Sequence, residues 1–255
     1  MSESRQSPLR INILTIFPEM FAGVFSSSIL GRAQEQGLLE IRLTDIRPYS
    51  DSKHHNTDDY PFGGGAGMVM MYQPIRDAMA SVTGEGFRGK RVYLGPRGRK
   101  LTTALARELA KEEELVLLCG HYEGVDQRAL DTCVDEEISI GDYILTGGEL
   151  AAMVLTDCVA RFIPGVLGSE ESPEEESFSD GLLEYPQYTR PRDLDGRCVP
   201  EVLLSGDHAK IRAWRRRESL AATARLRPDL LASAKLDDQD LKILKELEES
   251  CFSES

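Results

Sequence analysis

The first 168 residues alternate between two kinds of hydrophobic pattern. Short apolar and β-branched runs predict five strands, at Ile11–Phe17, Leu39–Ile46, Arg91–Gly95, Glu114–Gly120 and Ile138–Leu145. Segments with helical periodicity lie between and after them, at Pro18–Gln36, Thr102–Lys111, Val125–Cys133 and Glu149–Arg161. Strands that alternate with helices are typical of a parallel sheet with both faces covered, so we predict an α/β fold.

The pattern changes after an acidic stretch at residues 170–176, which contains one proline and almost nothing apolar. This composition predicts a mobile connector. Only helical segments are expected after it, at His208–Ala224, Pro228–Ala234 and Asp237–Glu249. Either Asp237 or Asp238 is available to cap the last helix. The predicted boundaries are an α/β domain at 1–168, a mobile linker at 169–180 and a small helical domain at 181–255.

The composition is that of a globular protein. The chain has 255 residues, 41% of them hydrophobic, which is enough for one large core or two modest ones. There is no basic-then-apolar leader, and no apolar run approaches the roughly 18 residues that a membrane span needs. We therefore predict a cytoplasmic protein with no membrane partner. Five scattered cysteines without a CxxC pair argue against both disulfides and a zinc site.

Charge is distributed unevenly along the chain. The net charge of −13 would normally count against a nucleic-acid partner, because phosphate binding needs local positive potential. One short segment is nevertheless strongly basic. Its cationic residues are Lys210, Arg212, Arg215, Arg216, Arg217, Arg225 and Arg227. An RNA-binding face is thus compatible with an acidic protein.

Four glycine-containing turns follow or flank the predicted strands. They are PFGGGAGM at 61–68, GPRG at 95–98, GHYEG at 120–124 and ISIGDYILTGGEL at 138–150. Glycine gives the backbone positive φ angles or lets a ligand approach it closely, at a cost in conformational entropy. In an α/β sheet the ligand crevice lies at the carboxyl ends of the strands, where several of these turns would meet. The turns therefore predict one composite site.

Two other motifs are weaker. GEGFRGK at 84–90 resembles the start of a phosphate-binding P-loop, but Arg91 stands where a Ser or Thr should hold magnesium, and a strand follows it. His54 and His55 are adjacent, so they cannot share the i, i+4 helical face that metal sites often use. We interpret both segments as polar turns.

Six motifs occur together in this chain. They are FPEMF at 17–21, PFGGGAGMVMM at 61–71, LCGHYEGVDQR at 118–128, DEEISIGDYILTGGEL at 135–150, RFIPGVLG at 161–168 and LEYPQYTRP at 183–191. As a set they resemble the bacterial tRNA (guanine-N1) methyltransferase TrmD family, and the likeness continues to residue 216. The resemblance implies a SPOUT fold, a parallel α/β sheet with a deep trefoil knot, followed by a small C-terminal helical domain. Such knots are exceptions to the general rule that protein chains are unknotted.

The resemblance also implies a site for S-adenosyl-L-methionine, the methyl donor. Aliphatic walls and exposed backbone groups can bind an adenine ring without a phosphate cradle. The residues that the resemblance places around this cofactor are Tyr93, Leu94, Pro96, Gly120, Tyr122, Glu123, Ile140, Gly141, Asp142, Tyr143, Ile144, Leu145, Gly147 and Gly148. A requirement for Mg2+ is left open, and no metal-ligating residues are assigned.

Methylation of guanine N1 needs a base for the N1 proton and a cation for the charge that develops on O6. The resemblance assigns the cationic role to Arg161, which precedes Phe-Ile-Pro as in the family. The base is an aspartate before Ser-Phe in the family, whereas this chain has Glu176 there. Glutamate retains the carboxylate and adds one methylene. Asp180 is the alternative base.

The resemblance implies tRNA as the substrate and a homodimer whose subunits both contribute to the site, with no DNA partner. The target is the guanosine immediately 3′ of the anticodon, which must be unstacked to react. The expected tRNA contacts are Gly63, Gly64, Gly65, Lys210, Arg212 and Arg215. Two alternatives remain: a SPOUT methyltransferase acting on another RNA, and a non-catalytic RNA-binding protein.

Overall fold

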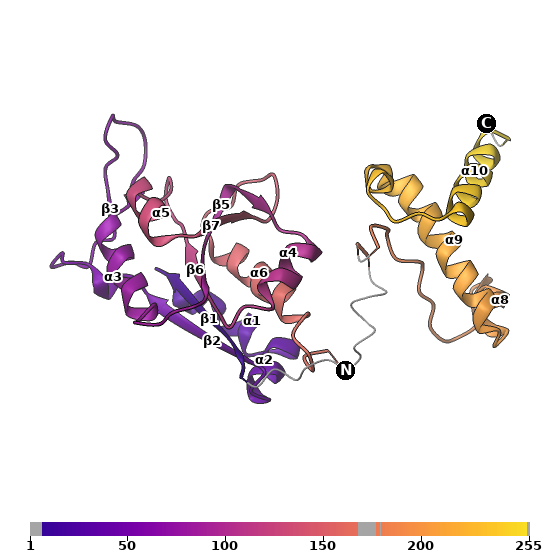
Figure 1. Cartoon of the computed structure of the whole chain (residues 1–255), viewed down its shortest axis with the longest axis horizontal. Coiled ribbons are helices and arrows are strands. Elements are labelled where there is room, and N and C mark those ends of the chain that lie inside the picture. Colours follow the sequence, from indigo (N-terminus) through magenta and orange to yellow (C-terminus); the bar gives the residue numbers. More distant parts are fainter. Residues whose placement is uncertain (1–6, 168–176, 179, 254–255) are drawn as a thin grey trace. The chain divides into compact units, whose positions relative to one another are not determined.

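The structure is a computed structural model that describes residues 7–167, 177–178 and 180–253. The chain divides into two compact units, Met1–Glu170 and Glu171–Ser255 (Figure 1). Most of the predicted linker lies outside the described residues.

The first unit is built on a parallel sheet. Its elements in chain order are β1 (Leu9–Thr15), η1 (Pro18–Phe21), α1 (Ala22–Phe25), α2 (Ser28–Glu35), β2 (Leu39–Asp45), η2 (Arg47–Tyr49), β3 (Asp58–Asp59), β4 (Val69–Met70), α3 (Tyr72–Val82), β5 (Lys90–Lys100), α4 (Thr103–Leu109), β6 (Glu114–Cys119), α5 (Gln127–Cys133), β7 (Glu136–Ser139) and α6 (Glu149–Ala160). Five strands pair in parallel in the order β2-β1-β6-β5-β7. This arrangement confirms the predicted α/β class.

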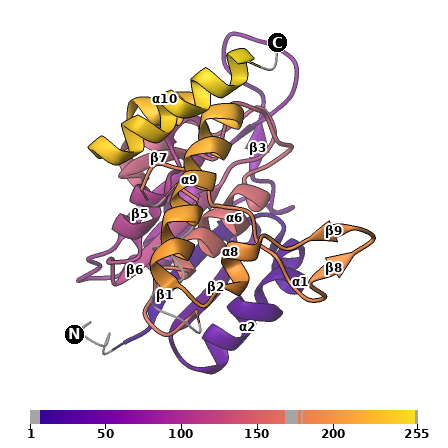
Figure 2. The same ribbon diagram turned by 90° about the vertical axis from the view of Figure 1, so that its right-hand side faces the viewer.

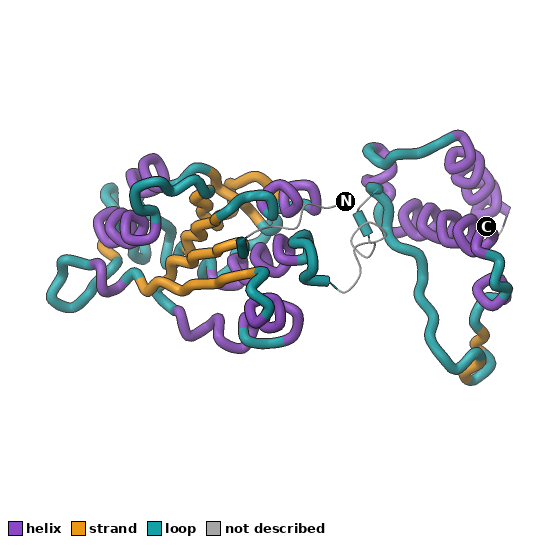
Figure 3. The backbone as a smooth tube through the Cα atoms, turned by 60° about the horizontal axis from the view of Figure 1, so that its bottom comes forward, coloured by secondary structure: helices purple, strands orange, loops and turns teal. Residues whose placement is uncertain are grey.

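Helices cover both faces of this sheet, with the strands between them (Figure 3). Leu115 and Leu117 of β6 pack with α2, α4 and α6, whereas Val116 and Leu118 face α3 and α5. Successive side chains of a strand point to opposite faces, so a strand covered on both sides is apolar throughout. The continuous apolar runs that predicted strands thus reflect burial on two sides.

Three local expectations were wrong or incomplete. The predicted helical segment Pro18–Gln36 is divided among η1, α1 and α2, and Ser28 has a φ of 54° where the helix is interrupted. The strand predicted at Ile138–Leu145 ends at Ser139, because Gly141 has a φ of 152° and turns the chain. Helix α3 was not predicted.

The second unit is mainly helical. Its elements are β8 (Asp193–Leu194), β9 (Arg197–Cys198), α8 (Glu201–Leu204), α9 (His208–Leu226), η3 (Pro228–Ala232) and α10 (Asp238–Ser253). Figure 2 shows α9 and α10 side by side and the β8–β9 hairpin projecting from them. The expectation of helices alone is corrected by this hairpin. Asp195 and Gly196 at its tip both have positive φ, the backbone that an Asp-Gly hairpin turn requires.

A buried ion pair holds α9 against α10. Asp240 is almost fully buried and accepts two hydrogen bonds from Arg216, from Nε at 3.0 Å and from Nη2 at 2.6 Å. The same Arg216 donates to the backbone oxygen of Lys235. Asp237 caps α10, since its side chain accepts from the backbone N–H groups of Gln239 and Asp240. Of the two candidate caps, Asp237 takes the role.

Replacing the buried carboxylate should destabilise the second unit. Asp240→Asn removes the closer of the two carboxylates near Arg216 and leaves Asp180 at 3.9 Å. We expect a loss of about 2–3 kcal/mol in unfolding free energy, because Arg216 is partly exposed. Trp214 is the only tryptophan and lies on α9, so its fluorescence during urea denaturation reports on this unit. An unchanged midpoint would contradict the expectation.

The same pair should give the second unit an acid dependence. The hydrogen bonds from Arg216 lower the pKa of Asp240 despite its burial. Its contribution is therefore complete above the unfolded-chain pKa of about 3.9 and is lost as the pH falls through the lower folded value. The Trp214 midpoint of the unaltered protein should fall below about pH 4, and Asp240→Asn should lack that part of the decrease.

Candidate functional site

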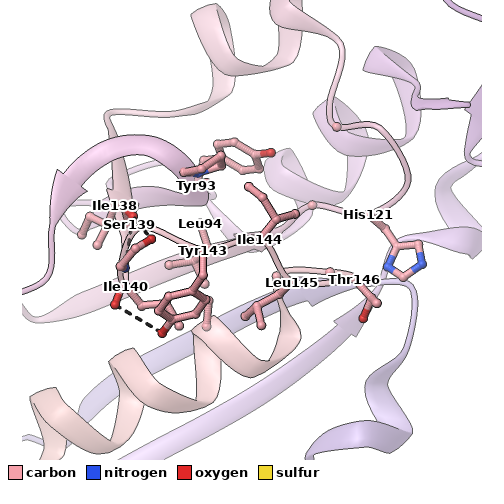
Figure 4. A pocket seen from close by; sticks show the side chains of 18 of the residues that line it. Tyr93, Leu94, His121, Ile138, Ser139, Ile140, Tyr143, Ile144, Leu145 and Thr146 are labelled. Carbon is pink, nitrogen blue, oxygen red and sulfur yellow. Dashed lines mark hydrogen bonds between the residues drawn. The ribbon is translucent and has the colours of Figure 1, made fainter. Parts of the chain in front are cut away.

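A cavity of about 340 Å³ lies at the carboxyl ends of β5, β6 and β7 (Figure 4). Three segments distant in sequence line it: residues 93–96, 120–124 and 138–148 apart from residue 142, with Ala151 of α6. This is the crevice position that ligands take in parallel α/β sheets. Its volume is near the lower end of small-molecule sites.

The segment after β7 folds into a tight turn that glycine makes possible. The Ser139 hydroxyl donates to the Gly141 oxygen at 3.1 Å, and the Tyr143 N–H donates to the same oxygen at 3.0 Å. A Cβ on Gly141 would lie 2.5 Å from Cε1 of Tyr143. The Tyr143 hydroxyl reaches the Ile140 oxygen at 3.4 Å, the dashed line drawn in Figure 4. Any side chain at Gly141 would therefore disturb this wall.

The next glycines let the chain return to the end of β6. The Gly148 N–H donates to the Gly120 oxygen at 2.7 Å, and Gly147 pairs with His121. A Cβ on Gly148 would lie 2.8 Å from the Cα of Cys119, closer than real Cβ contacts allow. These glycines in ISIGDYILTGGEL thus permit contact between two backbones, and α6 begins directly after them.

Tyr93 of β5 lines the cavity, and Glu137 of β7 lies near it. A Cβ on Gly120 would meet the Tyr93 hydroxyl at 2.8 Å, so Gly120 allows the buried ring to lie across the strand end. Burial, with a smaller contribution from the Glu137 carboxylate, raises the pKa of Tyr93, which keeps it a neutral phenol. Glu137 also accepts the Arg97 N–H at 3.1 Å. Glu137 thereby holds the GPRG loop within β5 against β7.

The turn after β6 connects the cavity to the glycine-rich loop at 61–68. Tyr122 has a φ of 58°, an uncommon conformation for a bulky residue. Burial and then the Asp58 carboxylate raise its pKa. Glu123 donates its N–H to the Met68 oxygen at 3.0 Å, and a Cβ on Gly67 would lie 2.5 Å from Cγ of Glu123. The loop is therefore attached to the rim of the cavity.

The structure brings together every residue predicted for the cofactor except Asp142. Asp142 is 94% exposed at its side chain, with its carboxylate 3.8 Å from Nζ of Lys100. Seven lining residues were not predicted: Gly95, His121, Gly124, Ile138, Ser139, Thr146 and Ala151. All but Ala151 lie within the four glycine-containing turns, so the turns were the available signal.

His121 has the most distinctive environment of these seven. Its ring packs edge-on against Phe17, with centroids 4.9 Å apart, and against Tyr122. Its Nδ1 atom is buried without a hydrogen-bond partner among the described residues. A buried polar atom without a partner is costly in free energy, so this histidine is an unusual feature of the cavity wall.

Chemically, the cavity suits a flat heterocycle. Leu94, Ile140 and Leu145 provide aliphatic walls, while the turns expose backbone N–H and C=O groups. No group of three or more His, Cys, Asp or Glu side chains within the described ranges is arranged to hold a metal ion. In the same ranges, none of the helices has the length and apolar character needed to cross a membrane.

Comparisons with known proteins agree on one family. A model of the family described as tRNA (Guanine-1)-methyltransferase TrmD matches residues 9–233. The chain belongs to the TrmD family. Proteins named tRNA (guanine-N(1)-)-methyltransferase are similar to it along nearly their whole length. That of Clostridium perfringens strain SM101 is 55% identical over 93% of this chain and 99% of its own. That of Geobacillus kaustophilus is 56% identical, over 94% and 98%.

Of the two residues predicted for catalysis, the structure describes Arg161 but not Glu176. Arg161 directly follows α6, is half-buried, and donates its N–H to the Asp157 oxygen at 3.3 Å. It does not line the cavity. Glu176 lies outside the described residues. Asp180, the alternative base, lies 3.9 Å from Nη1 of Arg216 within the second unit.

The cationic side chains of the basic segment have three kinds of surroundings. Arg216 and Arg217 pair with Asp240 and Glu246 of α10, so their charges are used within the second unit. Lys210 and Arg212 are exposed, and Lys210 lies 3.3 Å from Asp207. Arg215 stacks over the Tyr185 ring at 4.6 Å. The predicted contacts Lys210, Arg212 and Arg215 therefore have different surroundings, two exposed and one stacked.

Proposed function

We propose that the protein transfers the methyl group of S-adenosylmethionine to N1 of the guanosine immediately 3′ of the anticodon in tRNA. The observation that carries this proposal is the cavity at the ends of β5, β6 and β7, lined by the predicted cofactor residues other than Asp142. Family membership and relatives named tRNA (guanine-N(1)-)-methyltransferase support it. They favour it over another RNA substrate or a non-catalytic role.

In the proposed complex, the adenosine part of the donor occupies the aliphatic cavity. The turn at residues 139–143 contacts its ring, and Tyr122 and Glu123 lie toward the methionine end. When bound, S-adenosylmethionine would supply the methyl carbon to guanine N1, and its sulfur would leave as a neutral thioether. Glu176 takes the N1 proton, and Arg161 stabilises the charge on O6.

We propose that the first unit has the knotted SPOUT topology. Two features support the assignment. Strand β5 pairs with β7 at Leu94 and again at Arg99, with the GPRG segment looping out between them. The chain after β7 then returns to pack Gly148 onto the end of β6. The corresponding domain assignment is a catalytic domain at 1–168, a linker at 169–180 and a tRNA-binding domain at 181–255.

A homodimer in the cytoplasm completes the proposal. Leu150 and Val154, each 48% exposed, lie four residues apart on one face of α6. Met20 on η1, an element that contacts α6, and Val24 on α1 are also exposed. An apolar surface of this kind is typical of an interface between subunits.

A charge on this face should separate the subunits. Val154→Glu places a carboxylate in the proposed interface, and we expect a monomer with little methyltransferase activity. Leu241→Glu, on the exposed side of α10, is the control and should stay dimeric. Sedimentation velocity at assay concentrations measures both. An active monomer of the unaltered protein would end the dimer proposal.

The function itself is tested with anticodon stem-loops. Transfer of radioactive methyl from S-adenosylmethionine should occur when the target guanosine is preceded by another guanosine, and should stop when the target is changed to adenosine. Digestion of the product should yield 1-methylguanosine. Methylation of a ribosomal RNA fragment in preference to the stem-loop would favour the other RNA substrate, and no transfer to either would favour the binding protein.

A further inference from the structure

The loop between β3 and β4 carries two aromatic side chains that the fold leaves in solvent. Phe62 is 102% exposed and Tyr60 is 78% exposed, so neighbouring atoms cover little of either ring. Single exposed apolar residues are common on protein surfaces. Two nearly bare rings, two positions apart on a loop whose base is attached to the proposed cofactor cavity, are a more specific observation.

Local backbone chemistry explains why Phe62 projects. The Gly64 N–H donates to the Pro61 oxygen at 3.3 Å, which closes a four-residue turn over Pro61–Gly64. Gly63 in its third position has a φ of 90°, as a type II turn requires. Phe62 therefore occupies the second position, at the corner of the turn. A Cβ on Gly63, Gly64 or Gly65 would find no atom within 4 Å.

The base of this loop is fixed to the cavity. Strands β3 and β4 pair at Asp58–Met70 and Asp59–Val69, so residues 60–68 form a hairpin loop. Beyond the contact of Glu123 with Met68 and Gly67, the Met70 N–H donates to the Gly124 oxygen at 2.9 Å. Glu123 and Gly124 both line the cavity. The loop that carries the exposed rings thus extends from strands attached to the cavity wall, and its backbone lies beside β3 in Figure 1.

The surroundings of the rings favour a nucleobase over a protein partner. Protein hot spots lie in well-packed pockets surrounded by other side chains, whereas the neighbours of Phe62 are a proline and glycines without side chains. Stacking on a base needs only an open aromatic face and accepts any base. Single-stranded RNA loops present unstacked bases of this kind.

We propose that Phe62 stacks on an unpaired base of the tRNA anticodon loop next to the target guanosine, with Tyr60 as a second stacking surface. The inference rests on the proposed function and extends it, because it assigns substrate positioning to a residue outside the cavity. Stacking would hold the loop open while the target base enters. Phe62 is therefore a substrate-positioning residue and takes no part in methyl transfer.

The test compares Phe62→Leu with Phe62→Tyr. Leucine retains apolar bulk without an aromatic face, and tyrosine retains the face. For Phe62→Leu we expect KM for tRNA to rise roughly 10- to 100-fold, with S-adenosylmethionine affinity unchanged by calorimetry. Phe62→Tyr should remain within about twofold of the unaltered protein, and the exposed Leu241→Ala on α10 should be silent.

A spectroscopic measurement reports on stacking directly. An anticodon stem-loop with 2-aminopurine next to the target guanosine should lose fluorescence on binding the unaltered protein, because stacking quenches this base. Phe62→Leu at saturating protein should quench it less. Equal KM and equal quenching for Phe62→Leu and the unaltered protein would overturn the proposal. So would conversion of Phe62→Leu to a monomer in sedimentation, which would assign the ring to a second copy of the chain.

Failure of the proposed function has a different signature. If the unaltered protein neither binds S-adenosylmethionine nor methylates the stem-loop, the function is wrong whatever Phe62 does. If the unaltered protein is active and Phe62→Leu matches it, only the stacking role fails. Cofactor binding and methylation by the unaltered protein therefore decide which of the two proposals has failed.

Discussion

Glu176→Gln should lower turnover by about 10²–10⁴-fold and leave S-adenosylmethionine affinity nearly unchanged. The amide keeps the shape of the side chain but cannot accept the N1 proton, and losing a positioned acid–base group has an effect of this size. Single-turnover methylation of tRNA measures the chemical step. Calorimetry with S-adenosylmethionine measures the cofactor site separately.

Neighbouring carboxylates provide matched controls for this prediction. Glu174→Gln and Glu175→Gln should be nearly silent, and Glu176→Asp should retain substantial activity because it restores the family's residue. Asp180 is the competing candidate, but its carboxylate lies near Arg216 in the second unit. A fully active Glu176→Gln together with an inactive Asp180→Asn would assign the base to Asp180 instead.

Gly141→Ala should abolish measurable binding of S-adenosylmethionine. Its φ of 152° is essentially restricted to glycine, and the added Cβ would lie 2.5 Å from the Tyr143 ring. Either the turn refolds or Tyr143 moves, and both changes alter the cavity wall. Calorimetry should give no saturation at donor concentrations that saturate the unaltered protein, and Gly141→Val should be at least as severe.

Gly84→Ala is the matched control for this substitution. Gly84 lies in a surface loop, has no positive φ, and has no atom within 4 Å of a built Cβ. It should bind S-adenosylmethionine as the unaltered protein does. Trp214 lies in the second unit, whereas Gly84 and Gly141 both lie in the first. Its fluorescence during denaturation should therefore be the same for both variants. Normal binding by Gly141→Ala would mean that the cofactor site is elsewhere.

The sheet was predictable because buried strands appear in the sequence as short runs of apolar residues. Strands β1, β5 and β6 contribute side chains to the cores on both faces of the sheet, so each produces an apolar run that a short window detects. Helix α3 was missed, although half-buried and buried residues alternate along it with exposed ones. The β8–β9 hairpin was missed for another reason, since each strand has only two residues and both are exposed. An Asp-Gly pair was its only signal.

The residues of the candidate site were predictable in kind but not in arrangement. Glycine-containing turns identified the three segments that line the cavity, and family resemblance selected residues within them. Sequence alone extended the strand after Ile138 through Leu145, because half of that segment consists of isoleucine and leucine. The turn at Gly141 depends on hydrogen bonds from Ser139 and Tyr143, which propensity does not describe. His121 was missed because its surroundings come from Phe17 and Gly147, both distant in sequence.

The sequence by itself determined the parallel α/β class, the helical character of the C-terminal part, the family and the glycines that a close-packed site requires. The fold class, the helical character and the glycines follow from the periodicity of burial and the conformational freedom of single residues, which are local properties. The family follows from the resemblance of six motifs. Tertiary structure decided which groups those glycines admit: Gly148 lies against the backbone of Cys119, and Gly67 lies against the side chain of Glu123. It also decided that Arg216 pairs with Asp240 while Phe62 remains in solvent. Such outcomes depend on contacts between residues far apart in the chain, and a sequence pattern does not contain those distances.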